Sequence, residues 1–174
     1  KKAGYLKKRF KRVIIAKDNQ AVIDKSDWIF LGVLPKVGEN ILPKLNFKKN
    51  QTVISFMSTT NYPRLKKIIG KKVTIVRAIP MPPIRLCKGP VAIFPPNKKI
   101  KNFFNKIGTT IEIKNEKLSK NFWAISGTMA SFYELLNVLS NWLTTKKTNK
   151  LDAQKYVTSL YSALAELALL NSSK

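Results

Sequence analysis

The segment ISGTMASFYELL, residues 125–136, combines groups that could bind a ligand with the apolar spacing of a helix. Gly127 stands between two hydroxyl residues, Ser126 and Thr128. A glycine inside a helix costs about 1 kcal/mol relative to alanine, so some other interaction must offset it. Either the glycine permits close packing against a neighbour, or it breaks the helix so that a new helix start faces a ligand. The residues alone leave both explanations open.

Two further segments could line a ligand site, because each follows an apolar run that is typical of a strand. Val33 to Lys36 end the run LGVLPK, and the proline-rich stretch PMPPIRLCKGP, residues 80–90, follows VTIVRAI. Ligands of an open parallel sheet bind outside the carboxyl ends of its strands. Lys36 could reach a phosphate there or be merely solvated. The proline-rich stretch could line a ligand or be a plain connection.

Several catalytic signatures are missing from the sequence. Without histidine there is no His-based acid–base chemistry, no Ser-His-Asp triad and no typical zinc site. The single cysteine, Cys87, indicates a reducing compartment and has no base to activate it. Neither G-x-G-x-x-G nor G-x-x-x-x-G-K-[ST] occurs, so on these residues alone nothing cradles a pyrophosphate.

The chain is strongly basic, with 33 Lys+Arg against 9 Asp+Glu and a formal net charge of +24. Such an excess attracts the phosphates of a nucleic acid, a dinucleotide or a membrane surface. The lysines are spread over most expected turns, however, and no basic run alternates with aromatics in a way that favours base stacking. A lysine-rich solvated surface is the simpler explanation. A nucleic-acid partner remains the less favoured alternative.

Strand and helix patterns alternate along the first part of the chain. The expected strands are 12–16, 28–35, 52–58, 73–79, 91–94 and 109–113, and the expected helices are about 19–26, 37–45 and 62–70, the last with Gly70 as its C-cap. The nearly continuous apolar run 28–35 is typical of a strand buried on both faces. The alternation predicts an α/β fold with a mostly parallel sheet.

The period changes after residue 115. An apolar stripe at intervals of three and four residues predicts one long helix, or two helices broken near Gly127; it consists of Phe122, Ile125, Met129, Phe132, Leu136, Leu139 and Leu143. A further helix is expected at about 151–170. We therefore expect two domains, residues 1–114 and 115–174. Two such helices expose more apolar surface than they can bury against each other, which favours association with another subunit.

The order of four segments resembles the pyrroline-5-carboxylate reductase family, in a divergent reductase-like branch. These segments are DNQAVIDKSDWIFLGVLPK (18–36), TVISFMS (52–58), VTIVRAIPMPP (73–83) and ISGTMAS (125–131). The resemblance implies a Rossmann-type domain that binds NADP or NAD, followed by an all-helical domain that forms a homodimer. It also implies hydride transfer to a cyclic imine carboxylate, as in proline biosynthesis.

The resemblance also implies roles for individual residues. Asn19 would lie near the adenosine end of the cofactor, and the segment from Val33 through Leu34 and Pro35 to Lys36 would line the cofactor groove. The segment from Ala78 through Ile79 to Pro80 matches the loop that reaches the nicotinamide. Ser126 and Thr128 would hold the substrate carboxylate as catalytic residues, with Gly127 and Met129 completing the substrate site. A carboxylate suits the N–H groups and the dipole of a helix start.

The sequence departs from the family at defined positions. Leu34 replaces the family's lysine, Met81-Pro82 replaces Asn-Thr, and Met129-Ala130 replaces Gly-Pro. The opening glycine-rich βαβ unit and a late Pro-Gly-Gly segment are missing. Because residue 1 is lysine, we expect a processed or truncated chain.

These observations support two hypotheses. The first is an NAD(P)H-dependent imine reductase, a homodimer with a small imine or carboxylate substrate, located in the cytoplasm or an organellar matrix and not in a membrane. The alternative is a degenerate reductase fold that serves as a basic, non-catalytic subunit of an RNA-containing or other large assembly. Fold alone does not decide between them.

Overall fold

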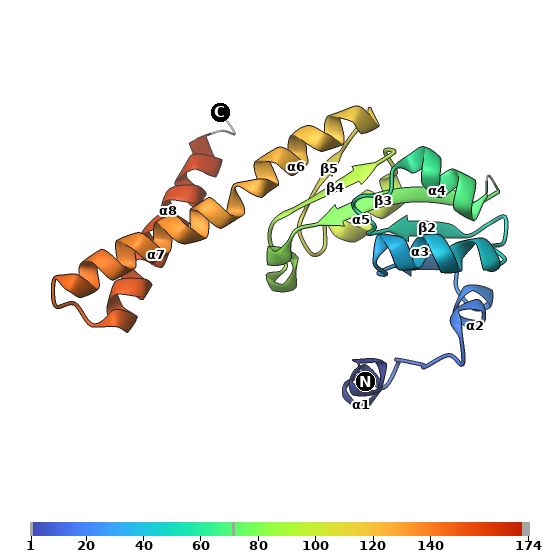
Figure 1. The fold of residues 1–174 in the computed structure, drawn as a ribbon, viewed down its shortest axis with the longest axis horizontal. Helices are drawn as coiled ribbons and strands as arrows, with labels where there is room; N and C mark the ends of the chain where they lie inside the picture. Colours follow the sequence, from blue (N-terminus) through green and yellow to red (C-terminus); the bar gives the residue numbers. More distant parts are fainter. Residues whose placement is uncertain (1, 71, 172–174) are drawn as a thin grey trace. The chain divides into compact units, whose positions relative to one another are not determined.

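The computed structural model describes residues 2–70 and 72–171, and the chain divides into two units (Figure 1). The first unit extends to Lys120 and the second begins at Asn121. The sequence predicts a boundary between residues 114 and 115. The structure instead places residues 115–120 in the first unit.

The first unit alternates strands and short helices. Its elements are α1 (Lys2–Arg9), α2 (Asn19–Asp24), β1 (Trp28–Leu31), α3 (Pro35–Ile41), η1 (Leu42–Lys44), β2 (Thr52–Ser55), α4 (Tyr62–Ile69), β3 (Thr74–Pro80), η2 (Pro82–Leu86), β4 (Pro90–Phe94), α5 (Lys98–Phe104), β5 (Thr109–Glu112) and η3 (Glu116–Leu118). Gly70 ends α4 with a positive φ of 101°, which confirms the predicted C-cap. Helix α5 was not predicted. Asn97 caps its start, and Ile100 and Phe104 form its buried side.

The five strands form one sheet in the order β1-β2-β3-β4-β5. Three of the pairings are parallel, and β3 pairs with β4 in antiparallel fashion. The mostly parallel sheet is therefore confirmed, with one reversal. The reversal has a simple cause, since the connection 81–89 is shorter than the dozen or more residues that a parallel crossover needs.

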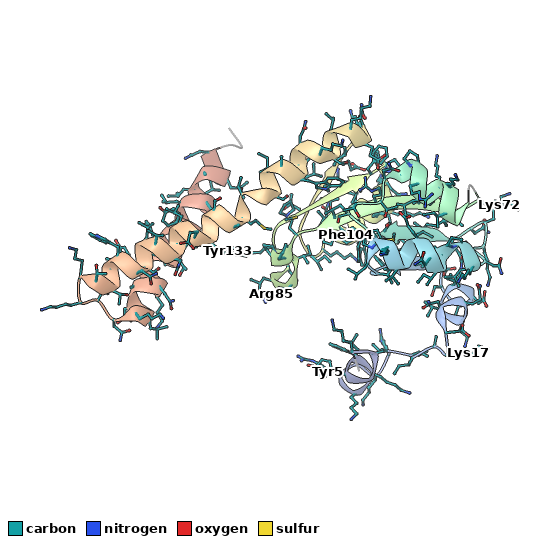
Figure 2. The ribbon with its side chains drawn as sticks, in the orientation of Figure 1. Tyr5, Lys17, Lys72, Arg85, Phe104 and Tyr133 are labelled. Carbon is teal, nitrogen blue, oxygen red and sulfur yellow. The ribbon has the colours of Figure 1, made fainter. Side chains whose placement is uncertain are left out.

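Apolar residues cover both faces of the sheet. One face carries Ile29, Leu31, Val53 and Ile75, and these residues pack against Leu42, Met57 and Leu65. The other face carries Ile54, Val76, Ala78, Val91 and Ile93, which pack with Ile100 and Phe104 of α5. Figure 2 shows Phe104 among the side chains at the sheet, whereas Tyr5 projects from α1 and is exposed. The sheet thus has the two-sided cover of an α/β layer.

Two predictions about strands were wrong. Residues 12–16 form no strand: Val13 N donates to Phe10 O in a turn, and Ile14 is 85% exposed. An apolar run becomes a strand only beside a partner strand, and the described residues offer it none. The run 28–35 forms a strand only as far as Leu31, and Phe30 is 41% exposed. This strand is an edge of the sheet, where burial on both faces is incomplete.

The second unit is helical, with α6 (Ser119–Gly127) beginning just before it, followed by α7 (Met129–Thr145) and α8 (Lys150–Asn171). Of the two alternatives that the apolar stripe left open, the structure has two helices, which are separated at Thr128. α7 and α8 pack on each other, and Ala153 and Val157 of α8 are buried. Leu160, Leu164 and Leu167 of α8 remain about half exposed. Of the helices described, none has the length and apolar character required to cross a membrane.

Candidate functional site

The carboxyl ends of β1, β2 and β3 lie at the same edge of the sheet. The strand register pairs Leu31 with Ser55, and Ser55 with Arg77. The chain leaves the sheet after Leu31 and after Ser55 at one level, whereas β3 continues beyond Arg77 to Pro80 and pairs there with β4. Val33–Lys36 and Ala78–Pro80 therefore lie at the same edge, on either side of the segment after β2, where ligands of parallel sheets bind.

Close packing of α3 fixes the segment Val33–Lys36. Pro35 occupies the first position of this helix, where its missing N–H costs nothing. Gly38 is buried against the core, and a Cβ at this position would lie 2.7 Å from Sδ and Cε of Met57. Glycine therefore lets α3 approach the sheet closely. Leu34 and Lys36 are exposed beside it, where a ligand can reach them.

Asn19 lies on the same side of the fold as Val33. It is the first residue of α2, whose start is capped by Asp18 Oδ1 accepting from Ala21 N at 2.8 Å. Asn19 and Val33 both line a mostly apolar cavity of about 100 Å³, together with Val22, Ile23, Ile29, Phe30, Leu31, Ile41, Leu42 and Leu45. The structure thus brings two of the predicted cofactor residues into one cavity.

The predicted nicotinamide segment ends β3. Ala78 is fully buried, Ile79 and Pro80 are half-buried, and Pro80 pairs with Val91 of β4. Because the Ala78 side chain is enclosed by the core, only its backbone could face a ligand. Ala78 and Pro80 lie two strands away from the cavity at β1.

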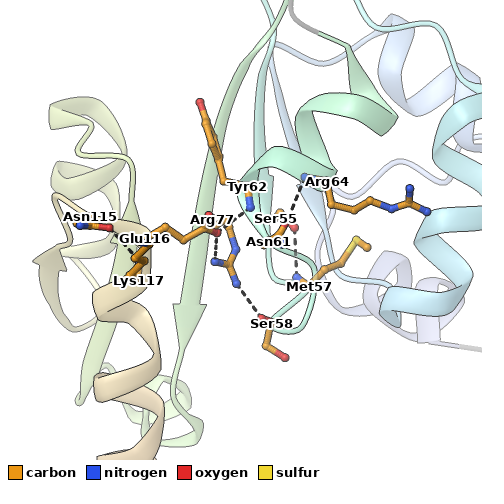
Figure 3. A network of polar contacts seen from close by, with 10 residues as sticks. All are labelled: Ser55, Met57, Ser58, Asn61, Tyr62, Arg64, Arg77, Asn115, Glu116 and Lys117. Atoms are coloured by element: carbon orange, nitrogen blue, oxygen red, sulfur yellow. Dashed lines mark hydrogen bonds and ion pairs between the residues drawn. The ribbon is translucent and has the colours of Figure 1, made fainter.

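Sequence reasoning missed an ion pair at this edge. Arg77, almost fully buried, forms an ion pair with Glu116 through Nη1 and donates from Nη2 to Ser58 O at 2.7 Å (Figure 3). Glu116 also accepts from Tyr62 N at 2.7 Å. One signal was present in the sequence, namely a single arginine inside the apolar strand VTIVRAI. A buried arginine requires a partner, but the sequence does not show which of the nine acidic residues supplies it.

The remaining predicted residues, Ser126–Met129, form the junction of α6 and α7. Thr128 N donates to Ile125 O, and Phe132 N donates to Thr128 O. Both hydroxyls are used locally: Ser126 Oγ donates to Phe122 O at 2.9 Å and Thr128 Oγ1 to Ile125 O at 2.7 Å. Direct donation to a substrate would require these hydroxyls to exchange their intrahelical partners.

Gly127 is exposed, and within this chain a Cβ added there would meet no atom within 4 Å. Close packing inside the chain therefore does not explain this glycine. A helix start that faces a ligand, and packing against a second subunit, remain as explanations. The first N–H groups of α7, at residues 129–131, are the donors that a helix start offers.

Comparison with known proteins bears on this geometry. A family model described as NADP oxidoreductase, coenzyme F420-dependent, matches residues 1–59. A pyrroline-5-carboxylate reductase of Aquifex aeolicus is 28% identical over 127 residues, which cover 69% of this chain and 47% of that protein. The chain resembles pyrroline-5-carboxylate reductases. It is similar to NAD(P)-dependent oxidoreductases, as the order of its segments predicts.

Solved structures confirm the fold. The pyrroline-5-carboxylate reductase of Streptococcus pyogenes superposes with a TM-score of 0.81 at 22% identity, covering 97% of this chain and 65% of that one. The Plasmodium falciparum pyrroline carboxylate reductase, solved with NADP bound, gives a TM-score of 0.78 at 20% identity, covering 87% and 61%. The chain thus has a partial Rossmann-type sheet followed by a helical region, and it spans about half to two thirds of the length of these relatives.

Proposed function

We propose that this chain acts in an NAD(P)H-dependent reductase that transfers hydride to the C=N bond of a cyclic imine carboxylate, as in proline biosynthesis. The observation that carries the proposal is the common edge formed by the carboxyl ends of β1, β2 and β3. Val33–Lys36 leave the sheet there after β1, and Ala78–Pro80 form the end of β3 on the other side of the segment that follows β2. The similarity to pyrroline-5-carboxylate reductases supplies the substrate class.

The residues at this edge fit part of a nicotinamide dinucleotide. The cavity beside Asn19 and Val33 is apolar with one amide, which suits a flat base and a ribose hydroxyl. The sequence has no glycine-rich loop. Within this chain the cofactor phosphates would therefore be bound by cations such as Lys36 at the start of α3. A reduced nicotinamide supplies the hydride when bound. Pro80 and the backbone of Ala78 would hold its ring at the end of β3.

The substrate carboxylate would bind at the start of α7. The first N–H groups of this helix and its positive dipole end favour an anion. Ser126 and Thr128 would turn their hydroxyl protons from Phe122 O and Ile125 O to the substrate. Gly127 and Met129 would border the bound imine. In this role the chain orients the imine, and the hydride comes from the cofactor.

A homodimer through the C-terminal helices would complete the protein. Leu160, Leu164 and Leu167 give α8 a half-exposed apolar side, and Trp142 and Val138 of α7 are exposed as well. Apolar surface of this extent on a helix pair favours burial against a second subunit.

Titration with NADPH tests the proposal. We expect saturable binding followed by nicotinamide fluorescence, and oxidation of NADPH on addition of pyrroline-5-carboxylate. Lys36→Ala should weaken binding about fivefold, as one partly solvated charge-assisted hydrogen bond would. Lys44→Ala, an exposed lysine at the end of η1, is the matched control and should bind as the wild type does. A wild-type protein without saturable binding at millimolar NADPH would refute the reductase function.

A further inference from the structure

Arg77 is a buried cation in the middle of β3, level with the end of β2 and next to a predicted cofactor segment. Its side chain is 3% exposed, and it directly precedes Ala78 in β3. It lies opposite Ser55 of β2, on the face covered by α3 and α4. A charge in this position is retained only with partners, because an unpaired buried charge is strongly unfavourable.

Two segments supply the partners described here. Arg77 contacts Glu116 of η3 through Nη1 and Ser58 O of the segment after β2 through Nη2. The carboxylate of Glu116 in turn accepts from Tyr62 N, the first residue of α4, where the helix dipole favours a negative charge. Figure 3 shows Arg77 between Glu116 and Ser58. The ion pair therefore connects Ser58 and Tyr62 of segment 56–62 to β3.

Segment 56–61 leaves the sheet between the two predicted cofactor segments. β2 lies between β1 and β3, so this segment forms the middle of the edge, with Val33–Lys36 on one side and Ala78–Pro80 on the other. At the start of this segment, Phe56 N donates to Leu31 O of β1 at 3.2 Å, and Met57 N donates to Ser55 Oγ at 3.2 Å, which turns the chain at the end of β2. From residue 58 onwards, the hydrogen bonds described between this segment and β3 run through Arg77 and its partner Glu116.

We propose that Arg77 and Glu116 are positioning residues for the nicotinamide cofactor, a role that rests on the proposed function. They act by fixing the position of segment 56–62, in the middle of the edge where the cofactor would bind, and of Ala78–Pro80 beside it. A buried ion pair adds little net stability compared with apolar residues of the same shape. The directional bonds of the Arg77 guanidinium, however, fix the positions of β3, η3 and the segment after β2 relative to one another.

A matched pair of variants tests this inference. In Glu116→Gln the amide keeps the shape and one acceptor oxygen but removes the charge. The control is Glu112→Gln, because Glu112 has the same kind of bonds elsewhere: it accepts from Lys101 Nζ at 3.0 Å and from Asn97 N at 3.1 Å. The carboxylates of Glu116 and Glu112 are similarly exposed, at 21% and 27%. The readouts are the dissociation constant for NADPH, KM and kcat for NADPH oxidation, and the melting temperature.

We expect Glu116→Gln to raise the dissociation constant and KM for NADPH about tenfold, which corresponds to about 1.4 kcal/mol. The value of kcat should remain within about twofold, because positioning affects binding in the ground state and the transition state alike. Glu112→Gln should lower the melting temperature less, because its partner Lys101 is 41% exposed whereas Arg77 is 3% exposed, and it should leave NADPH binding unchanged. A purely structural role of Glu116 would give the two variants the same cofactor affinity, and this result would overturn the inference while leaving the reductase function standing.

Two further outcomes are decisive. If the wild-type protein binds no NADPH, the proposed function fails and this inference fails with it. If Glu116→Gln does not fold, Arg77→Lys replaces it, because lysine keeps the charge opposite Glu116 but cannot also bond Ser58 O through a fork. Arg77→Lys should then weaken NADPH binding severalfold, and wild-type affinity in a folded Arg77→Lys protein would overturn the inference.

Discussion

Replacing Gly127 by alanine should make the protein more stable and less active. Apart from the adjacent residues and the nearby backbone of its own helix, no described atom lies within 4 Å of the new Cβ, and the φ of Gly127 is outside the left-handed region that favours glycine. Alanine therefore fits without strain, and it restricts the unfolded chain. Because Gly127 is the last residue of α6, the full helix-interior gain of about 1 kcal/mol is an upper limit, and we expect about 0.5–1 kcal/mol.

This gain can be measured directly. For a chain of this length, 1 kcal/mol shifts the melting temperature by about 2–4 °C, so Gly127→Ala should raise it by about 1–4 °C. Urea unfolding should show a higher midpoint at an unchanged slope. Ala124→Gly makes the opposite exchange at an exposed position of α6 and should lower the midpoint by a similar amount.

The functional effect should have the opposite sign. Alanine favours continuation of α6 into α7, so that the first N–H groups of α7 acquire helical partners and are lost to a substrate carboxylate. We expect kcat/KM for the imine to fall about tenfold, while NADPH affinity stays unchanged. A more stable protein with undiminished imine turnover would refute the idea that the break serves a ligand. A loss of stability together with dissociation of the dimer would assign Gly127 to a subunit interface.

The remaining predictions concern packing and assembly. Gly38→Ala should destabilise the fold by about 1–3 kcal/mol, because its Cβ collides with the buried end of the Met57 side chain. The control Gly32→Ala has open space around the new Cβ and should change the urea midpoint little. Equal effects of the two variants would contradict this account of α3 packing. Leu164→Glu should halve the mass measured by light scattering, because it places a charge on the apolar side of α8. The control Leu86→Glu changes a more exposed leucine of η2 and should leave the mass unchanged. An unaltered mass for the Leu164 variant would argue against a dimer through α8.

Local patterns predicted most elements of the fold. The strands 52–58, 73–79, 91–94 and 109–113 all exist within one to three residues of their expected ends, and Gly70 ends its helix as expected. These features depend on apolar spacing and on glycine geometry, which are properties of short segments. The run 12–16 failed because strand formation depends on a partner strand, which short-range patterns do not contain.

The candidate site divides in the same way. The strands β1 and β2 could be predicted from the sequence but their ends at Leu31 and Ser55 could not, because the apolar runs continue to residues 35 and 58. A break near Gly127 was one of the two alternatives that the apolar spacing left open. The pairing of Arg77 with Glu116 could not be predicted, because the two residues are 39 positions apart and nothing in either local sequence selects the other. Likewise, the cavity shared by Asn19 and Val33 exists only once α2 and α3 pack on β1.

By itself, the sequence determined the approximate positions of most strands and helices, and its lack of histidine excluded histidine chemistry through composition alone. Tertiary structure decided which segments meet, namely the reversal of β4, the exposed edge at β1 and the ion pair that holds the segment after β2. The physical reason is that local conformation follows from the energies of neighbouring residues. Contacts between distant segments depend instead on how the whole chain packs its apolar faces.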